Sequence, residues 1–151
     1  MGMMAWNDLD IDIENENMSL DKLHRLSQFI IEKFHPVWYE AKEETNAEKK
    51  TVWFHGFEAV IGNELWNVDL WFFDKDTIRA AEAYCDGIAQ QVKQRPEAKA
   101  QIIHLKRELI ARKLYSFDRY TSMDVYDAVL NQHISDIESF LKITREQQVP
   151  D

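Results

Sequence analysis

Acidic and aliphatic residues alternate near the start of the chain, over residues 7–13. In a β-strand this period of two places Asp8, Asp10 and Asp12 on one face and the aliphatic residues on the other. Carboxylates that share a face repel one another unless a cation or hydrogen-bond donors offset the repulsion. The stretch therefore predicts a cation-binding face or, as the alternative, an ordinary strand with one face in solvent.

Another aspartate lies in the most apolar stretch of the chain, residues 65–73. Asp69 stands there between Val68 and Leu70, where an unpaired carboxylate is costly if the strand is covered. If this strand lies beside the first one, Asp8, Asp10 and Asp69 converge. Such a set suits Mg²⁺, which binds through a few carboxylates together with water and substrate phosphates. Two such ions can stabilise the attacking and leaving oxygens during a displacement at phosphorus.

The order of these motifs resembles the nucleotidyltransferase superfamily related to DNA polymerase β. Residues 7–11, Asn-Asp-Leu-Asp-Ile, are similar to the Ser-Asp-Ile-Asp-Leu element of that superfamily. A later strand of the superfamily brings a third aspartate in an apolar setting, as residues 65–73 do here. The resemblance extends loosely over residues 7–75 and is closest to small bacterial members with a helical C-terminal segment.

The resemblance implies a role for each of these residues. Asp8 and Asp10 would bind the metal ions, and Asp69 would bind one ion and help activate the acceptor hydroxyl. The implied reaction is the transfer of a nucleoside monophosphate from a nucleoside triphosphate (NTP) to a hydroxyl of a small molecule or a protein, with Mg²⁺ or Mn²⁺ as cofactor. Lys106 or Lys113, from a basic helix, would reach the nucleotide phosphates. For both lysines the alternative is a solvated helix face.

Trp71 shares the predicted face of Asp69 and is expected to line a substrate pocket, with a place in the core as the alternative. The superfamily also has a Gly-Ser pair upstream of its first aspartate, on a turn that holds the triphosphate. The residues before Asp8 contain no such pair, and the chain is expected to begin just after that element. The predicted function therefore includes an inactive relative. The alternative function is a non-catalytic acidic binding protein of the antitoxin, immunity or inhibitor type.

Composition limits the partners. The chain has 151 residues, which suits one domain. Its formal net charge of −9 makes nucleic acid an unlikely partner.

Cys85 is the single cysteine, so it forms no disulfide within the chain, and we expect it to be buried on a helix. No stretch is typical of a signal peptide or a membrane span, which predicts a cytoplasmic protein. The sequence gives no indication of the oligomeric state.

The first half of the chain reads as strands around one helix. Ser19 is a good helix N-cap, and apolar residues at helical spacing predict a helix over 19–35 that ends before Pro36. A short strand is predicted over 37–41, and the charged stretch 42–50 is predicted to be a solvated loop.

Two further strands, 51–61 and 65–73, are predicted to form a hairpin with its turn at 62–64. A helical reading of residues 53–72 stays open, because some of their apolar residues also fit a helical spacing. The density of Trp, Phe and Val favours strands.

Helical periodicity begins at Asp76 or Thr77 and continues to the end of the chain. A first helix is predicted to end at Arg95-Pro96, a second follows the proline, and a third runs from Thr121 or Ser122 to about Gln147, with His133 on its face. The predicted fold is α+β: a small mixed β-sheet with a packed helix, then a bundle of about three helices. We expect one domain, 1–151, with a sheet half, 1–75, and a helical half, 76–151.

Overall fold

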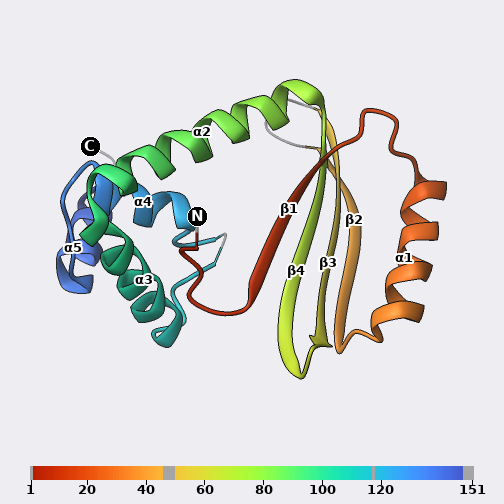
Figure 1. Ribbon diagram of the computed structural model, residues 1–151, viewed down its shortest axis with the longest axis horizontal. Helices are drawn as coiled ribbons and strands as arrows, with labels where there is room; N and C mark the ends of the chain where they lie inside the picture. The colour runs from red at the N-terminus through yellow and green to blue at the C-terminus, as the bar shows by residue number, and fades with distance from the viewer. Residues whose placement is uncertain (1, 46–49, 117, 148–151) are drawn as a thin grey trace. The chain divides into compact units, whose positions relative to one another are not determined.

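The computed structural model describes residues 2–45, 50–116 and 118–147. Its elements in chain order are β1 (Asp8–Glu14), α1 (Leu20–Phe34), β2 (Trp38–Thr45), β3 (Thr51–Ile61), β4 (Glu64–Phe73), α2 (Lys75–Gln94), α3 (Pro96–Ala111), α4 (Ser122–Leu130) and α5 (Ile137–Gln147) (Figure 1). The fold is therefore α+β. None of the helices in the described ranges is both long and apolar enough to cross a membrane.

The chain forms two compact units, and the division between them falls within α2. The sheet unit is Trp6–Ala83, and the helical unit consists of Met1–Ala5 with Tyr84–Asp151. All the candidate aspartates belong to the sheet unit. Lys106 and Lys113 belong to the helical unit.

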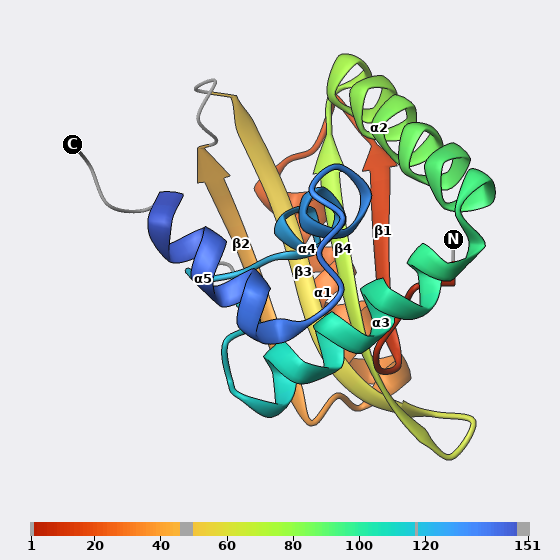
Figure 2. The ribbon, with the colours of Figure 1, turned by 90° about the vertical axis from the view of Figure 1, so that its left-hand side faces the viewer.

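The sheet unit contains four strands in the order β1-β4-β3-β2, seen side by side in Figure 2. β1 is parallel to β4, whereas β3 is antiparallel to both β4 and β2. The β3–β4 hairpin turns through Gly62 and Asn63, whose φ angles of 59° and 70° are both positive. Two successive positive φ values are typical of the tight hairpin turn that matches the twist of its strands. The predicted hairpin is confirmed.

β2 is longer than predicted. The charged residues 42–45, predicted to belong to a loop, pair in register with Thr51–Phe54 of β3. Backbone pairing needs no apolar side chain, and Lys42 lies between Glu40 and Glu44 at 3.6 and 3.5 Å, which offsets the like charges along the strand. The prediction of a loop was wrong for these residues, and residues 46–49 lie outside the described ranges.

α1 covers one face of the sheet. The Ser19 side chain accepts a hydrogen bond from the Lys22 backbone N–H at 3.4 Å, which caps the first turn. The helix buries Ile30 against Phe57 and Val68 of the sheet. The opposite face of the sheet is the one that carries the aspartates.

The helical unit has a core made by α3, α4 and α5, with Met3 packed into it. The predicted third helix is in fact two helices, because the chain leaves helical geometry between α4 and α5. His133 has a φ of 58° there, so it is not on a helix face as predicted. Asp136 starts α5 by accepting a hydrogen bond from the Ser139 backbone N–H at 2.9 Å.

Cys85 is exposed on α2, and the prediction that it is buried was wrong. The physical reason is the narrow apolar stripe of this helix, in which only Ile88 is fully buried among its residues. The remaining surface of α2 faces solvent for most of its length.

Candidate functional site

The sheet brings Asp10 and Asp69 directly opposite each other on the parallel strands β1 and β4. Asp8 lies one row along, opposite Asn67. Because side chains two residues apart on a strand share a face, all three carboxylates lie on the face of the sheet opposite α1. This is the arrangement on which the predicted site depends.

The row that contains Asp10 and Asp69 continues across the whole sheet. Asp69 pairs with Gly56 of β3, and Gly56 pairs with Glu40 of β2. A third carboxylate therefore ends this row, separated from Asp69 by a residue without a side chain. Glu40 and Gly56 were not predicted as site residues, because only the register of β2, β3 and β4 places them in this row.

Gly56 makes room for its aromatic neighbours beside Asp69. A Cβ atom at this position would lie 2.5 Å from the end of the Phe54 ring and 3.0 Å from the Trp38 ring. These distances are shorter than any ordinary contact, so a larger residue would displace the rings. The Phe54 and Trp38 rings therefore occupy the space that a side chain at position 56 would fill.

The electrostatics of the face are unfavourable for negative charge. Burial raises the pKa of Asp69 to about 6, with the charges of Asp10 and Asp8 as further causes and Glu40 as a smaller one. A hydrogen bond from Asn67 acts in the opposite direction. A cation placed nearby would therefore stabilise the charged form of Asp69. Without one, Asp69 holds a proton more readily than an ordinary aspartate.

The rows on either side of Asp69 contain a hydrogen-bond donor and a group of packed aromatic rings. The Asn67 side chain donates a hydrogen bond to the Asp8 carboxylate at 2.8 Å. On the other side of Asp69, the Trp71 ring packs 4.4 Å from the Phe54 ring and stacks on the Phe73 ring at 5.9 Å. Trp71 therefore shares the face of Asp69 and is held by two aromatic contacts.

The spacing of the acidic side chains bears on metal binding. Across the described ranges, no group of three or more His, Cys, Asp or Glu side chains is close enough to hold a metal ion. Mg²⁺ keeps several waters and needs only one or two carboxylates. Asp10 and Asp69 lie opposite each other and offer hard oxygen donors of this kind. A cation beside them would offset the repulsion that contributes to the raised pKa of Asp69.

The two candidate lysines of the helical unit have different surroundings. Lys106 is 6% exposed, and its ammonium group donates a hydrogen bond to the Tyr126 hydroxyl at 3.1 Å and lies 4.8 Å from the centre of the Tyr126 ring. Lys113 is exposed and follows the end of α3 with a φ of 56°. Lys106 is therefore fixed by its neighbours, whereas Lys113 is a surface residue.

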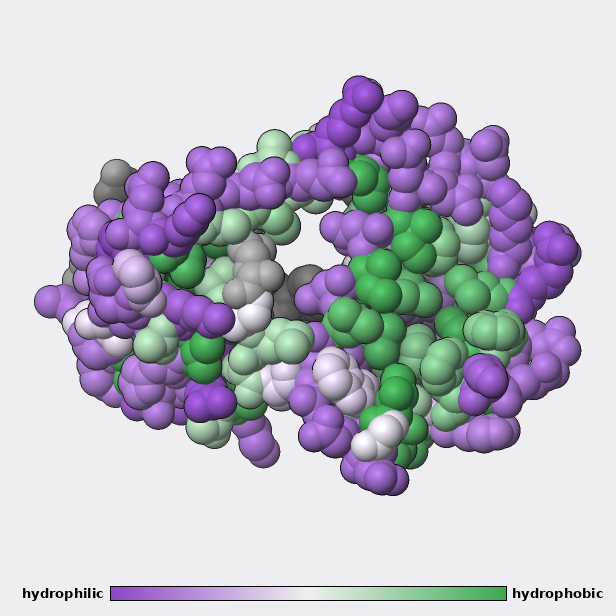
Figure 3. All heavy atoms as spheres, viewed as in Figure 1, coloured by the Kyte–Doolittle hydropathy of each residue, from purple (hydrophilic) through white to green (hydrophobic). Residues whose placement is uncertain are grey.

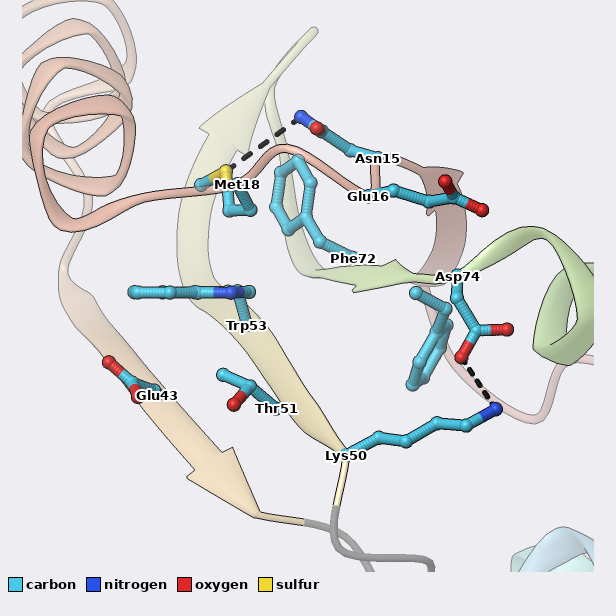
Figure 4. A pocket seen from close by; sticks show the side chains of 10 residues that line it. Asn15, Glu16, Met18, Glu43, Lys50, Thr51, Trp53, Phe72 and Asp74 are labelled. Atoms are coloured by element: carbon cyan, nitrogen blue, oxygen red, sulfur yellow. Dashed lines mark hydrogen bonds and ion pairs between the residues drawn. The ribbon is translucent and has the colours of Figure 1, made fainter.

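A pocket of about 540 Å³ lies at the end of the sheet where β1 and β4 finish (Figure 4). Its lining residues are Asn15, Glu16, Met18, Glu43, Lys50, Thr51, Trp53, Phe72, Phe73 and Asp74. Lys50 and Asp74 form an ion pair of 2.8 Å at its rim, and this contact lowers the pKa of Asp74 to about 2. The candidate aspartates and Trp71 do not line this pocket. The pocket was not predicted from the sequence, because the stretch 42–50, which contains Glu43 and Lys50 of its lining, was predicted to be a solvated loop.

His55 stands at one end of a partly buried hydrogen-bond chain beneath α1. The Ser27 hydroxyl donates to the Leu23 carbonyl, and the Tyr39 hydroxyl donates to Ser27 at 2.6 Å. Tyr39 has no second proton, so its contact of 2.8 Å with Nδ1 of His55 requires that His55 donates. Nε2 of His55 is then a bare acceptor, buried without a partner among the described residues. Burial lowers the pKa of His55 to about 4.

No family model, curated protein sequence or solved structure matches this chain.

Proposed function

We propose that the chain is a nucleotidyltransferase-like protein that uses Mg²⁺ or Mn²⁺ to transfer a nucleoside monophosphate from an NTP to a hydroxyl group. The observation that carries this proposal is the opposition of Asp10 and Asp69 on two parallel strands, with Asp8 on the same face. The raised pKa of Asp69 supports it further, because a face that disfavours its own negative charge is suited to bind cations.

In the proposed reaction the acceptor oxygen attacks the α-phosphorus, a new P–O bond forms, and the bond to the β-phosphate breaks with release of pyrophosphate. Asp69 accepts the proton of the acceptor hydroxyl. A carboxylate whose pKa is near 6 is a better proton acceptor than an ordinary aspartate. Asp10 and Asp69, with Asp8 beside them on the same face, would hold the metal ion, which would neutralise charge on the phosphate oxygens.

Trp71 is proposed to border the substrate, because it lies on the same face of the sheet as Asp69. The acceptor is proposed to be a small molecule or a protein. A net charge of −9 opposes the approach of a nucleic-acid backbone.

A metal titration followed by a nucleotide assay tests this proposal. We expect Mn²⁺ or Mg²⁺ with a non-hydrolysable ATP analogue to raise the Tm of the protein, and Asp10→Asn to abolish this rise. Pyrophosphate release from ATP, with water as acceptor, is expected to fall by about 100-fold or more in Asp69→Asn, because a positioned base contributes on that order. Asp12→Asn is the matched control: it changes the next carboxylate of β1 on the same face and is expected to retain metal binding.

The proposal fails if metal and nucleotide leave the Tm of the wild type unchanged and Asp69→Asn only stabilises the protein. That outcome would favour the second candidate, a non-catalytic acidic binding protein. The observation behind this alternative is that no ready metal-ligand group occurs among the described residues, so the acidic face would then serve to attract a partner.

A further inference from the structure

Among the residues that the structure describes, β1 is the last strand on one side of the sheet and pairs only with β4. The Asn67 N–H donates to the Asn7 carbonyl, and the Asn15 N–H donates to the Phe73 carbonyl. In a parallel pair the bonding residues of a strand recur with a period of two. The odd-numbered residues of β1 therefore face β4, and the backbone groups of Asp8 and Asp12 point toward the outer edge.

The side chains along this edge are of two opposite kinds. Leu9 and Ile11 are 43% and 38% exposed on one face, and the aspartates of β1 lie on the other. Figure 3 shows hydrophobic side chains gathered along the side of β1 that faces α1, with hydrophilic ones beside them. An edge strand with exposed aliphatic residues and outward backbone groups is a template for an added strand.

Charge decides what kind of strand can be added. A second copy of this chain, paired through its own β1, would set aspartates opposite aspartates, and like charges across a strand pair are destabilising. A strand with Lys or Arg at alternate positions would set opposite charges across the pair instead. Its aliphatic residues would at the same time cover Leu9 and Ile11.

We propose that β1 is a docking edge for an extended, basic segment of another protein, in which Lys or Arg alternates with aliphatic residues and which adds to the sheet beside β1. This inference does not depend on the proposed nucleotidyl transfer. Asp12 and the aliphatic face of β1 are available to such a segment whether or not a cation is bound at Asp10 and Asp69.

The probe is a synthetic peptide as long as β1, seven residues, with Lys and Ile in alternation and blocked ends. Its binding to the full chain is measured by calorimetry and by backbone amide shifts, in EDTA and without nucleotide. We expect binding that weakens with salt and shifts the amides of β1. A peptide with Glu in place of Lys, and a Lys peptide N-methylated along the bonding edge, are both expected not to bind.

Three variants locate the site. Asp12→Lys is expected to weaken the affinity by about tenfold, since it replaces an attractive cross-strand pair with a repulsive one. Glu82→Lys makes the same charge change on an exposed part of α2 and is expected to weaken it by less than about twofold. Ile11→Thr keeps the β-branched shape and tests the apolar contact. It is expected to weaken the affinity by about threefold to tenfold.

The proposal is overturned if the Lys–Ile peptide does not bind, if its N-methylated form binds equally well, or if Glu82→Lys weakens binding as much as Asp12→Lys. It is also overturned if sedimentation shows a dimer that Ile11→Thr dissociates, because the edge would then serve a second copy. Since metal and nucleotide are absent from the assay, failure of the proposed catalysis leaves these results unaffected.

Discussion

Burial shifts the pKa of one carboxylate and one imidazole in the sheet unit in the direction that favours their neutral forms. Asp69 has its pKa raised and His55 has its pKa lowered, in both cases with burial as the leading cause. Both residues therefore favour the neutral form in the folded protein. Each makes the stability of the protein depend on pH, and the two effects have opposite signs.

Asp69→Asn is expected to raise the free energy of unfolding near pH 7.5 by roughly 1–3 kcal/mol. The pKa of Asp69 lies above its unfolded value of 3.8, so the folded state bears the cost of the charged carboxylate above pH 6 and loses that cost as the pH falls toward 3.8. The gain in the variant should therefore fade between pH 6 and pH 4 in urea unfolding curves. Asp21→Asn, at a carboxylate that is 76% exposed on α1, is the control and is expected to change little. An equal gain at pH 4 would contradict the explanation.

His55 is expected to lower stability as the medium becomes acidic. Its pKa is about 4 in the folded protein and 6.5 in the unfolded chain, so the unfolded state alone binds a proton between these values. The loss is fully developed below pH 4 and amounts to about 3 kcal/mol. The free energies of unfolding of the wild type and of His55→Gln, taken from unfolding curves, should converge as the pH falls from 6.5 to 4. His24→Gln, at an exposed position of α1, is the control, and its free energy of unfolding should depend on pH in the same way as that of the wild type.

At the scale of the elements, a matched pair of glycine substitutions separates crowding from helix propensity. Gly56→Ala is expected to destabilise the protein by roughly 1–3 kcal/mol, because its Cβ would meet the Phe54 ring. Gly87→Ala, in α2, meets nothing within 4 Å and is expected to stabilise by about 0.5–1 kcal/mol. Thermal unfolding of both variants gives the measurement. A stabilising Gly56→Ala would show that the rings move aside at little cost.

The elements also show what the sequence could and could not predict. The alternation of residues 7–13 and the aromatic stretch at 65–73 predicted β1 and β4, because one-sided burial leaves a period of two in the sequence. The polar end of β2 left no such pattern, since its pairing is made by the backbone. The break between α4 and α5 has no proline or glycine to mark it: the chain leaves helical geometry at His133, whose φ is 58°, and Asp136 then caps the start of α5.

The register of the candidate site could not be predicted either. Three aspartates of β1 share one face, and the alternation does not show which of them lies opposite Asp69. The pairing of two strands far apart in the chain selected Asp10 and left Asp8 opposite Asn67. Glu40 and Gly56 entered the row through the same long-range pairing, which local sequence does not encode.

At the scale of the whole molecule, the net charge of −9 is expected to make stability depend on ionic strength. Raising NaCl from about 20 to about 300 mM shortens the Debye length and screens the repulsion among carboxylates. The Tm is expected to rise with NaCl. At matched ionic strength MgCl₂ should raise it further if the acidic row binds the ion, and Asp10→Asn should remove only this additional rise. A Tm that is insensitive to NaCl would contradict the argument.

Cys85 gives the whole molecule one chemically addressable point. It is the single thiol in the sequence and is exposed, close to where the chain passes from the sheet unit to the helical unit. A maleimide dye or nitroxide would therefore attach at one position of the native sequence, with no prior removal of other thiols. The same exposure means that air oxidation would join two copies covalently, so a purified sample needs a reductant before its mass in solution is interpreted.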